Sequence, residues 1–267
     1  MENADTAVWA ALMETDPDRK VRRVAALRCG DNPAGTPVAI LVPGRPAQPI
    51  LVAPKALPKR RSLRTAEGRA VLIHALTHIE FNAINLALDA VYRFPGLPEA
   101  FYQDWLAVAR EEALHFQLLR EHLRSLGSDY GALPAHDGLW QMAAETAADP
   151  LLRMALVPRV LEARGLDVTP GIQARLAQAG DLRAVEILER IHHDELGHVA
   201  VGSRWFRYLC ASRGLDPEET FFALVNTHFR GRLQGPYQEE VRLQAGFSPR
   251  EMAWLKARQN PPADCRF

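Results

Sequence analysis

Two segments of the sequence carry the same local pattern of a glutamate and a histidine. Glu112 to His115 reads Glu-Ala-Leu-His, and Glu195 to His198 reads Glu-Leu-Gly-His. Residues three apart lie on one face of a helix, so the carboxylate and the imidazole of each segment can reach the same metal ion. A single copy is weak evidence, because Glu and His also pair on solvated helix faces.

The neighbours at helical spacing indicate that both segments face a protein interior. They are mostly apolar, and a lone buried charge is costly unless it is neutralised, paired or bound to a metal. Around Glu112 the row comprises Trp105, Val108, Ala109, His115, Phe116, Leu119 and Leu123; around Glu195 it comprises Ala184, Val185, Leu188, Ile191, His192, His198, Val199 and Gly202.

One acid lies on the inward row of each of two further predicted helices. Glu80 shares its row with Ile73, Leu76, Ala83, Ile84, Ala87 and Val91, and Glu162 with Leu151, Met154, Ala155 and Leu166. The intervals from these acids to the next Glu-x-x-His are similar, 112 − 80 = 32 and 195 − 162 = 33 residues. Such a set is typical of a carboxylate-bridged dimetal site in a ferritin-like four-helix bundle. The predicted metal ligands are Glu80, Glu112, His115, Glu162, Glu195 and His198.

The donor atoms of this set favour iron or manganese. Four carboxylates offset most of the charge of two divalent ions, and the two imidazoles add one nitrogen ligand per metal. Hard oxygen donors together with imidazole suit iron or manganese. We therefore predict two Fe ions as the cofactor, with Mn as the alternative.

Long Ala- and Leu-rich stretches separated by breakers predict an all-α fold. Four long helices are expected over residues 65–94, 98–126, 149–180 and 181–212, as two hairpins of a ferritin-like four-helix bundle. In the first hairpin the two glutamates lie equally far from the turn, at 94 − 80 = 14 and 112 − 98 = 14 residues. They are therefore expected at one height along the helices.

The second hairpin is less regular, because the helix over 149–180 contains Pro158, Gly165 and Pro170. Glu162 lies 180 − 162 = 18 residues before the turn and Glu195 lies 195 − 181 = 14 after it. An irregularity from Gly165 to Pro170 is expected to absorb the surplus.

The rest of the chain is predicted as additions to this bundle. One helix is expected over residues 6–29, followed by a proline-rich extended stretch over 32–58, and shorter helices over 139–147, 217–229 and 249–258. We expect two parts: residues 1–64 as an N-terminal helix and extended segment packed on the bundle, and residues 65–267 as the bundle with C-terminal helices.

Composition bounds the class of protein. The 267 residues include 32 basic and 32 acidic side chains, so no global field favours nucleic acid or an anionic membrane. Cys29, Cys210 and Cys265 are widely spaced, which predicts neither a disulfide framework nor a thiolate zinc site. Residues 1–5 do not resemble the start of a signal peptide, and no apolar run approaches a membrane span. A cytoplasmic protein is expected.

Four segments carry a resemblance to known families. They are residues 75–83 around His78-Ile79-Glu80, residues 101–105 leading into 110–116, residues 130–140, and residues 191–199. On these the chain resembles the ferritin-like superfamily, and more closely an uncharacterised bacterial ferritin-like family of unknown function, over nearly its whole length. It also looks like a distant relative of the di-iron hydroxylase that oxidises a hypermodified adenosine in tRNA. The resemblance implies the same six metal ligands.

Several neighbouring residues leave alternatives open. Glu111 could replace Glu112 as a ligand, although it lies off the apolar row. His192 is either a partner of a metal ligand or a satisfied core histidine. His136 either caps the site or bonds to the adjacent Asp137, and Arg164 either pairs with a ligand carboxylate or lies on the surface. His74 and His78 fall away from the Glu80 row and receive no role.

The leading functional hypothesis is a non-haem di-iron oxidoreductase that activates dioxygen to oxidise or hydroxylate an organic substrate. Two others stand beside it: a centre that oxidises iron or consumes peroxide, and a non-catalytic metal-stabilised scaffold or binding module. The expected partners are a small-molecule or modified-nucleoside substrate and an electron donor, without a membrane. The basic run from Lys55 to Arg64 is the only local support for a nucleic-acid partner.

Overall fold

Helices make up almost all of the regular structure of this protein. The computed structural model describes residues 6–28, 30, 37–58, 62–231 and 233–259, and these form no strand beyond an isolated parallel bridge between Leu51 and Ala135. The predicted all-α class is confirmed. The chain divides into two compact units: unit 1 comprises Met1–Ala147 and Gln173–Leu188, and unit 2 comprises Ala148–Ile172 and Glu189–Phe267.

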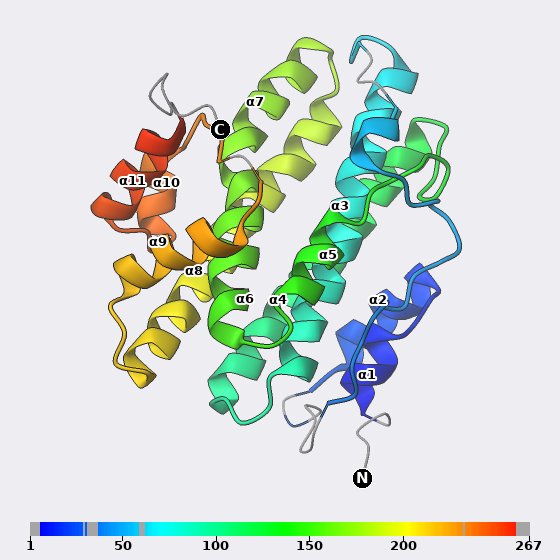
Figure 1. The fold of residues 1–267 in the computed structure, drawn as a ribbon. Coiled ribbons are helices and arrows are strands. Elements are labelled where there is room, and N and C mark those ends of the chain that lie inside the picture. Colours follow the sequence, from blue (N-terminus) through cyan, green and yellow to red (C-terminus); the bar gives the residue numbers. More distant parts are fainter. Residues whose placement is uncertain (1–5, 29, 31–36, 59–61, 232, 260–267) are drawn as a thin grey trace. The chain divides into compact units, whose positions relative to one another are not determined.

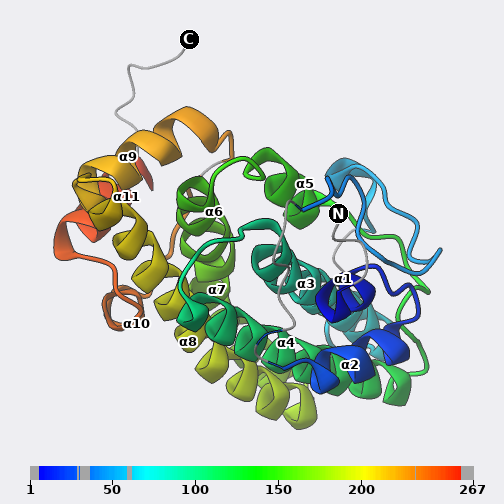
Figure 2. The same cartoon turned by 90° about the horizontal axis from the view of Figure 1, so that it is seen from below.

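Unit 1 is built on a long helical hairpin. Helices α3 (Ala66–Arg93) and α4 (Glu99–Ser125) lie side by side, as Figures 1 and 2 both show. The hydroxyl of Thr65 caps α3 by accepting from the backbone N–H of Gly68. Gly96 has a φ of 82°, which a side chain would strain, and it allows the chain to reverse between the helices. This is the first hairpin expected from the sequence.

The N-terminal residues pack on that hairpin as two helices, where the sequence predicted one. Helix α1 (Ala7–Leu12) contacts α3, and α2 (Pro17–Ala26) contacts α4. The prediction of a single helix was wrong because Asp16 caps a new helix at the backbone N–H of Arg19, and Pro17 fits its first turn. The 3₁₀ turn η1 (Pro54–Ala56) and helix α5 (Gly138–Glu145) complete the elements that lie wholly in unit 1.

A buried lysine ties these helices together. Lys20 is fully buried, and its Nζ donates to the carbonyl oxygens of Ala11 and Leu12 and to Oδ1 of Asn85, at 2.7 to 3.0 Å. The carbonyls are the last ones of α1, which lack partners within the helix. One side chain of α2 therefore caps α1 and anchors both helices to α3.

Unit 2 begins with one long, irregular helical stretch. Helix α6 (Pro150–Leu156) passes into the π-helical segment η2 (Val157–Glu162) and then into α7 (Ala163–Gln178). Helix α8 (Leu182–Ser212) follows, then α9 (Pro217–His228), α10 (Glu239–Gln244) and α11 (Pro249–Gln259). Both α7 and α8 run through residues of the two units.

The irregularity of this stretch includes the first of the three residues that the sequence marked. The location from Gly165 to Pro170, expected to absorb the surplus, was wrong, because α7 continues through both residues. The departure from α-helix occurs earlier, over η2, which begins at Val157 and includes Pro158, a residue without the N–H that an α-helix would use there. Counting residues back from the turn before α8 therefore does not give the position of Glu162 along the helix axis.

Helix α3 is also long and apolar enough to span a membrane by length and composition. Its most apolar 18-residue window has a mean hydropathy of 1.3, and 72% of that window is buried inside the structure. Such burial is what a core helix of a globular unit shows. Cytoplasmic localisation stays a prediction.

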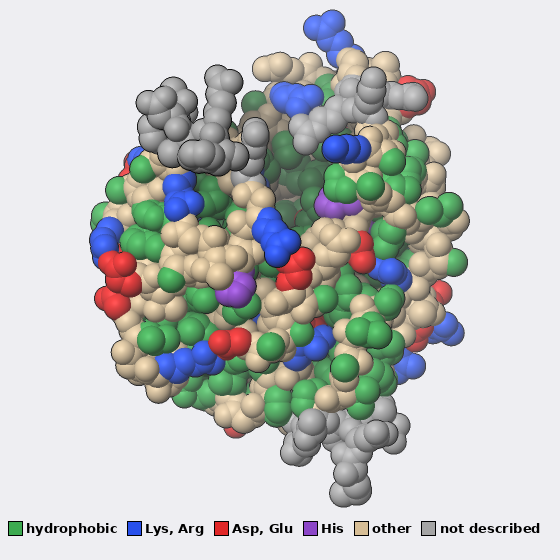
Figure 3. All heavy atoms as spheres, in the orientation of Figure 1, with side chains coloured by type: hydrophobic (Ala, Val, Ile, Leu, Met, Phe, Trp, Pro, Cys, Tyr) green, Lys and Arg blue, Asp and Glu red, His purple; other side chains and the backbone are tan. Residues whose placement is uncertain are grey.

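Surface charges are mixed. On the face drawn in Figure 3, blue Lys and Arg side chains are interspersed with red Asp and Glu side chains among the described residues. Of the basic run from Lys55 to Arg64, residues 59–61 lie outside the described residues. The suggested nucleic-acid contact there stays a prediction.

Candidate metal centre

Unit 1 brings three of the six predicted ligands into one buried group. Glu80 comes from α3, and Glu112 and His115 come from α4. Each offers a ligand atom, and these atoms lie within 4.8 Å of one another. Nδ1 of His115 is 3.4 Å from Oε2 of Glu112 and 3.5 Å from Oε2 of Glu80. Glu112 and His115 are 0% exposed and Glu80 is 4% exposed, so the group is closed to bulk water.

The three buried side chains of this group shift one another's pKa values. Burial raises the pKa of Glu80 well above its ordinary value, and the charge of Glu112 raises it further. Burial lowers the pKa of His115, but the carboxylates of Glu112 and Glu80 outweigh it and raise the pKa to about 11. Two carboxylates and one imidazole thus hold a proton that a metal ion would replace.

These residues fit a hard divalent cation. Oε2 of Glu80 is buried and, apart from the 3.5 Å approach of His115 Nδ1, has no hydrogen-bond partner in the described part of the chain. A buried oxygen of this kind is an available ligand atom, because an unsatisfied polar atom is otherwise costly. Two carboxylates with one imidazole suit iron or manganese. The metal identity and the number of ions stay predictions.

Unit 2 carries a second set of the same types. Nδ1 of His198 lies 3.9 Å from Oε1 of Glu195, one turn earlier on α8. His198 is 1% exposed, whereas the side chain of Glu195 is 12% exposed. The pair therefore repeats the arrangement of Glu112 and His115 with more access to solvent.

Two contacts fix the height of Glu162 on the opposite helix. A Cβ atom on Gly202 would lie 2.3 Å from Cβ of Pro158, so α8 and η2 touch there. Eight residues further along, the ring of His192 lies 3.2 Å from the carbonyl oxygen of Leu166. From the first contact to the second, the chain advances from Pro158 to Leu166 on one helix and goes back from Gly202 to His192 on α8. The two helices are therefore antiparallel here. Glu162 lies midway between the contacts, level with the Glu195–His198 turn.

Glu162 is the last residue of the π-helical segment. π-helical turns are rare and occur frequently at functional sites, because the extra residue redirects the side chains beside it. The sequence predicted a kink in this helix and an acid on its inward row, but not that the two would coincide.

Burial and contacts distinguish the alternatives left open for Glu111 and Arg164. Glu111 is half-buried while Glu112 is fully buried, which agrees with Glu112 as the inward acid. Arg164 donates to the carbonyl oxygen of Gln234 at 2.5 Å and lies 3.9 Å from Asp167. Its side chain is 39% exposed, and neither contact is a predicted ligand, which fits the surface reading.

The two histidines left open have partners outside the predicted ligand set. His192 contacts the carbonyl of Leu166, as a satisfied histidine does. His136 accepts from the backbone N–H of Gly138 at 3.1 Å, while Asp137 accepts from Arg45 at 2.9 Å. The predicted bond between His136 and Asp137 was wrong, because Asp137 has a cationic partner from the proline-rich stretch.

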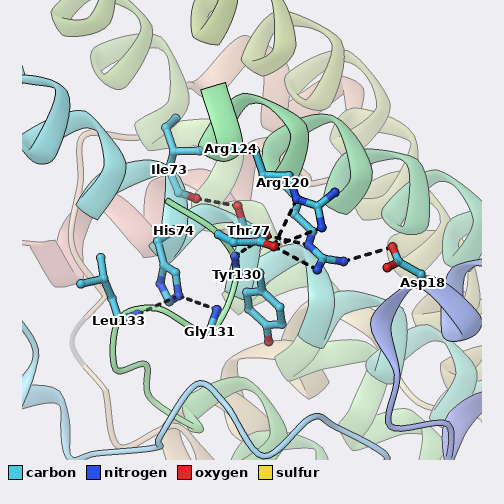
Figure 4. A network of polar contacts seen from close by, with 10 residues as sticks. Asp18, Ile73, His74, Thr77, Arg120, Arg124, Tyr130, Gly131 and Leu133 are labelled. Carbon is cyan, nitrogen blue, oxygen red and sulfur yellow. Dashed lines mark hydrogen bonds and ion pairs between the residues drawn. The ribbon is translucent and has the colours of Figure 1, made fainter. Parts of the chain in front are cut away.

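Sequence reasoning missed the role of His74 and His78. Nε2 of His74 accepts from the backbone N–H groups of Gly131 and Leu133, at 3.1 and 3.4 Å, as Figure 4 shows. Nδ1 of His78 lies 3.0 Å from the hydroxyl of Tyr130. Both histidines fasten the loop after α4 to α3. Their spacing of four residues, continued by Asn82, was the available signal.

Tyr130 connects this loop with the buried group. Its ring centroid lies 5.3 Å from those of Phe81 and Phe116, which directly follow Glu80 and His115 in sequence. Burial raises the pKa of Tyr130 beyond the range in which a phenol ionises in water. Arg120 donates to the adjacent Asp129 at 2.8 Å, so the loop is held where the Tyr130 ring covers Phe81 and Phe116.

The comparisons with other proteins agree on a family without an assigned activity. Residues 9–253 match the family described as "Protein of unknown function (DUF455)". The chain belongs to the DUF455 family. A relative from Haemophilus influenzae (strain ATCC 51907 / DSM 11121 / KW20 / Rd), named "Uncharacterized protein", is 51% identical over 217 residues, which cover 79% of this chain and 75% of the relative. No solved structure matches.

The DUF455 match includes all six predicted ligands. The expected resemblance to an uncharacterised family of unknown function is confirmed, whereas membership of the ferritin-like superfamily stays a prediction.

Proposed function

We propose that this protein is a non-haem dimetal carboxylate protein of the ferritin-like type that oxidises an organic substrate with dioxygen. Its ligands are Glu80, Glu112 and His115 from unit 1 and Glu162, Glu195 and His198 from unit 2. Iron is the proposed metal, with manganese as the alternative. The two sets have the same composition and similar spacing, and this sequence pattern is typical of a ferritin-like four-helix bundle.

The buried group of unit 1 is the observation that carries the proposal. Glu80 and Glu112 lie side by side without bulk water, a placement that raises the pKa of Glu80 by burial and by like charge. Nothing in helix formation or core packing favours such a pair. A cation between the carboxylates turns the repulsion into attraction, and His115 adds the nitrogen donor that iron and manganese accept.

The chain's own residues hold and shield the metals. Two bound ferrous ions would supply the electrons that reduce dioxygen. Glu80 and Glu112 would hold the metal, and His115 must release a proton before it can ligate. Phe81, Phe116 and Tyr130 exclude water beside the ligand turns, which protects reactive species from side reactions.

Ferrous iron stoichiometry tests the proposal first. Anaerobically reconstituted protein is expected to bind two Fe²⁺ per chain and, when oxygen is admitted, to develop a ferric absorption band in the near ultraviolet. Background iron with intact helicity would refute the six-ligand assignment. Two irons that stay ferrous in air would leave a scaffold, and turnover of Fe²⁺ or peroxide without an organic substrate would redirect the reaction to ferroxidase or peroxidase chemistry.

A modified nucleoside is one substrate class to test. The chain has equal numbers of acidic and basic residues, so a free nucleoside or another small molecule suits it better than a long phosphate backbone. Binding to bulk tRNA that weakens steeply with salt would favour the polynucleotide instead. Binding of a nucleoside that does not change with salt would favour the small molecule.

A further inference from the structure

Two buried ion pairs flank Glu162 along the helical stretch of unit 2. Arg159, three residues before it, donates to Oε2 of Glu251 at 2.7 Å. Asp167, five residues after it, accepts from Nε and Nη2 of Arg242 at 3.0 and 2.7 Å. All four paired side chains are at most 4% exposed. Arg242 and Glu251, from the last part of the chain, thus bind the helical stretch on both sides of Glu162.

One aromatic ring joins the two pairs into a single cluster. The guanidinium carbons of Arg159 and Arg242 lie 4.6 and 4.9 Å from the ring centroid of Phe247. Desolvated cation–π contacts of this kind are strong. We call the cluster of Arg159, Asp167, Arg242, Phe247 and Glu251 the arginine clamp.

The C-terminal side of the clamp is rigid. Oε2 of Glu251 accepts from the backbone N–H of Ser248 at 2.8 Å, and Oγ of Ser248 accepts from the backbone N–H of Glu251 at 3.1 Å. This reciprocal capping box fixes Glu251 in the first turn of α11. Arg242 also donates to the carbonyl oxygen of Ala163, the first residue of α7, at 3.1 Å. The clamp therefore contacts the π-helical segment and the helix that continues it.

A π-helical segment needs such support because the α-helical register competes with it. A π-turn contains one residue more than an α-turn, and removing that surplus rotates the side chains at its end by about 100°. Glu162 stands at that end. A register change would also pull Arg159 from Glu251 and leave a buried charge without its partner, which is strongly unfavourable.

We propose that the arginine clamp positions Glu162 for metal binding by holding segment Val157–Glu162 in its π-helical register. Arg159 and Glu251 are positioning residues that act through Glu162. The inference rests on the proposed function, and it makes occupancy of the unit 2 ligand set depend on α10 and α11. By thermodynamic reciprocity, a metal ion bound at Glu162 stabilises the clamp in return.

A double variant separates positioning from simple stability. Arg159→Met with Glu251→Leu replaces the buried pair by apolar side chains, a change that commonly preserves folding. The probe is Co²⁺ alone, followed by calorimetry and by its visible ligand-field absorption. Wild-type protein is expected to bind two equivalents, and the double variant to keep one and bind the second at least about tenfold more weakly. The exposed pair of Arg213 and Asp149 supplies the control variant Arg213→Gln, which should bind like wild type.

A folded double variant that binds two Co²⁺ with unchanged affinity and spectrum would overturn the clamp. Wild-type protein that binds no Co²⁺ would instead refute the proposed function. Loss of the second equivalent in Glu162→Gln, but not in the double variant, would reject the clamp and keep the metal centre.

A second measurement requires no variant. Hydrogen exchange of wild-type protein is expected to slow in residues 157–162 and in α11 together when Co²⁺ is added. If the double variant does not fold, hydrogen exchange of the wild-type protein alone tests the inference. Slowing in residues 157–162 without any change in α11 would contradict the inference.

Discussion

The two ligand sets have the same composition but stand on helices of different kinds. In unit 1, Glu80, Glu112 and His115 project from two regular α-helices, are buried and contact one another. In unit 2, Glu162 ends a π-helical segment. Regular helices fix side-chain directions through their own hydrogen bonds, whereas a π-segment depends on contacts from elsewhere. We infer that the predicted ligands of unit 1 are already positioned by their helices, and we call this set the preformed half. The position of Glu162 in unit 2 depends on contacts from other helices, and we call that set the adjustable half.

Breaking the clamp with a single substitution should have the largest effect. Arg159→Met leaves Glu251 buried and unpaired, so unfolding free energy is expected to fall by about 3 to 5 kcal/mol. Arg213→Met removes an exposed pair from the same unit and should cost less than about 1 kcal/mol. Urea denaturation compares the two. Equal losses would show that the buried pair has no special weight.

Removing a ligand from the preformed half should be next in size. Glu112→Gln is expected to weaken Fe²⁺ binding by more than about 100-fold, because even indirect changes around metal sites cost 10- to 100-fold. Glu111→Gln, at the adjacent half-buried position, is the matched control and should bind normally. Calorimetry under anaerobic conditions measures both. The reverse ranking would make Glu111 the ligand.

The contact between η2 and α8 offers a probe of the adjustable half. Gly202→Ala places a Cβ 2.3 Å from Cβ of Pro158, so the helices must shift, at a cost of roughly 1 to 3 kcal/mol. Gly197→Ala on the same helix meets nothing within 4 Å and should stabilise the protein by about 0.5 to 1 kcal/mol. Thermal unfolding should therefore move in opposite directions. A stabilising Gly202→Ala would refute the close approach.

The pH dependence should reflect the proton held by unit 1. The pKa of His115 is raised to about 11 in the fold, above the ordinary value of 6.5, so its stabilising effect is complete below pH 6.5 and fades as the pH rises toward 11. Metal-free protein should lose stability over that range. Metal affinity should rise by about tenfold per pH unit for each proton displaced. Calorimetry in two buffers counts the released protons, and a count of zero at pH 7 would exclude a protonated His115.

The smallest expected effect concerns the cover of unit 1. Tyr130→Phe removes the hydroxyl 3.0 Å from His78 but keeps the aromatic packing, so about 1 kcal/mol of stability should be lost. Metal binding should stay as in wild type. A large loss of iron affinity would show that the loop positions ligands as well as covering them.

The sequence predicted the long helices well because their ends carry local signals. Gly96, Gly127 and Gly180 all adopt positive φ just after α3, α4 and α7, and the predicted helices over 65–94, 98–126 and 149–180 end at or within two residues of them. The break at Pro17 was missed, although no large apolar side chain lies between Met13 and Val21 and Asp16 with Pro17 forms a cap and first turn. Local signals therefore mark where the long helices end, but a further helix start inside a predicted helix can still be overlooked.

The candidate site was partly predictable for the same reason. Helical spacing identified Glu80 and Glu112 as inward acids, and both are buried. The π-register at Glu162 could not be predicted, since Arg159 in the same segment pairs with Glu251, 92 residues further along the chain than Arg159. The role of His74 was also hidden, because its partners lie in a loop 57 and 59 residues away.

The distance between Arg159 and Glu251 also orders events during synthesis. The unit 1 set is encoded within 115 − 80 = 35 residues and can assemble while the ribosome is still translating the message. The partner of Arg159 arrives 92 residues later. On the proposed function, a nascent chain would therefore take up its first ion early, whereas the second would wait until Glu251 has been synthesised.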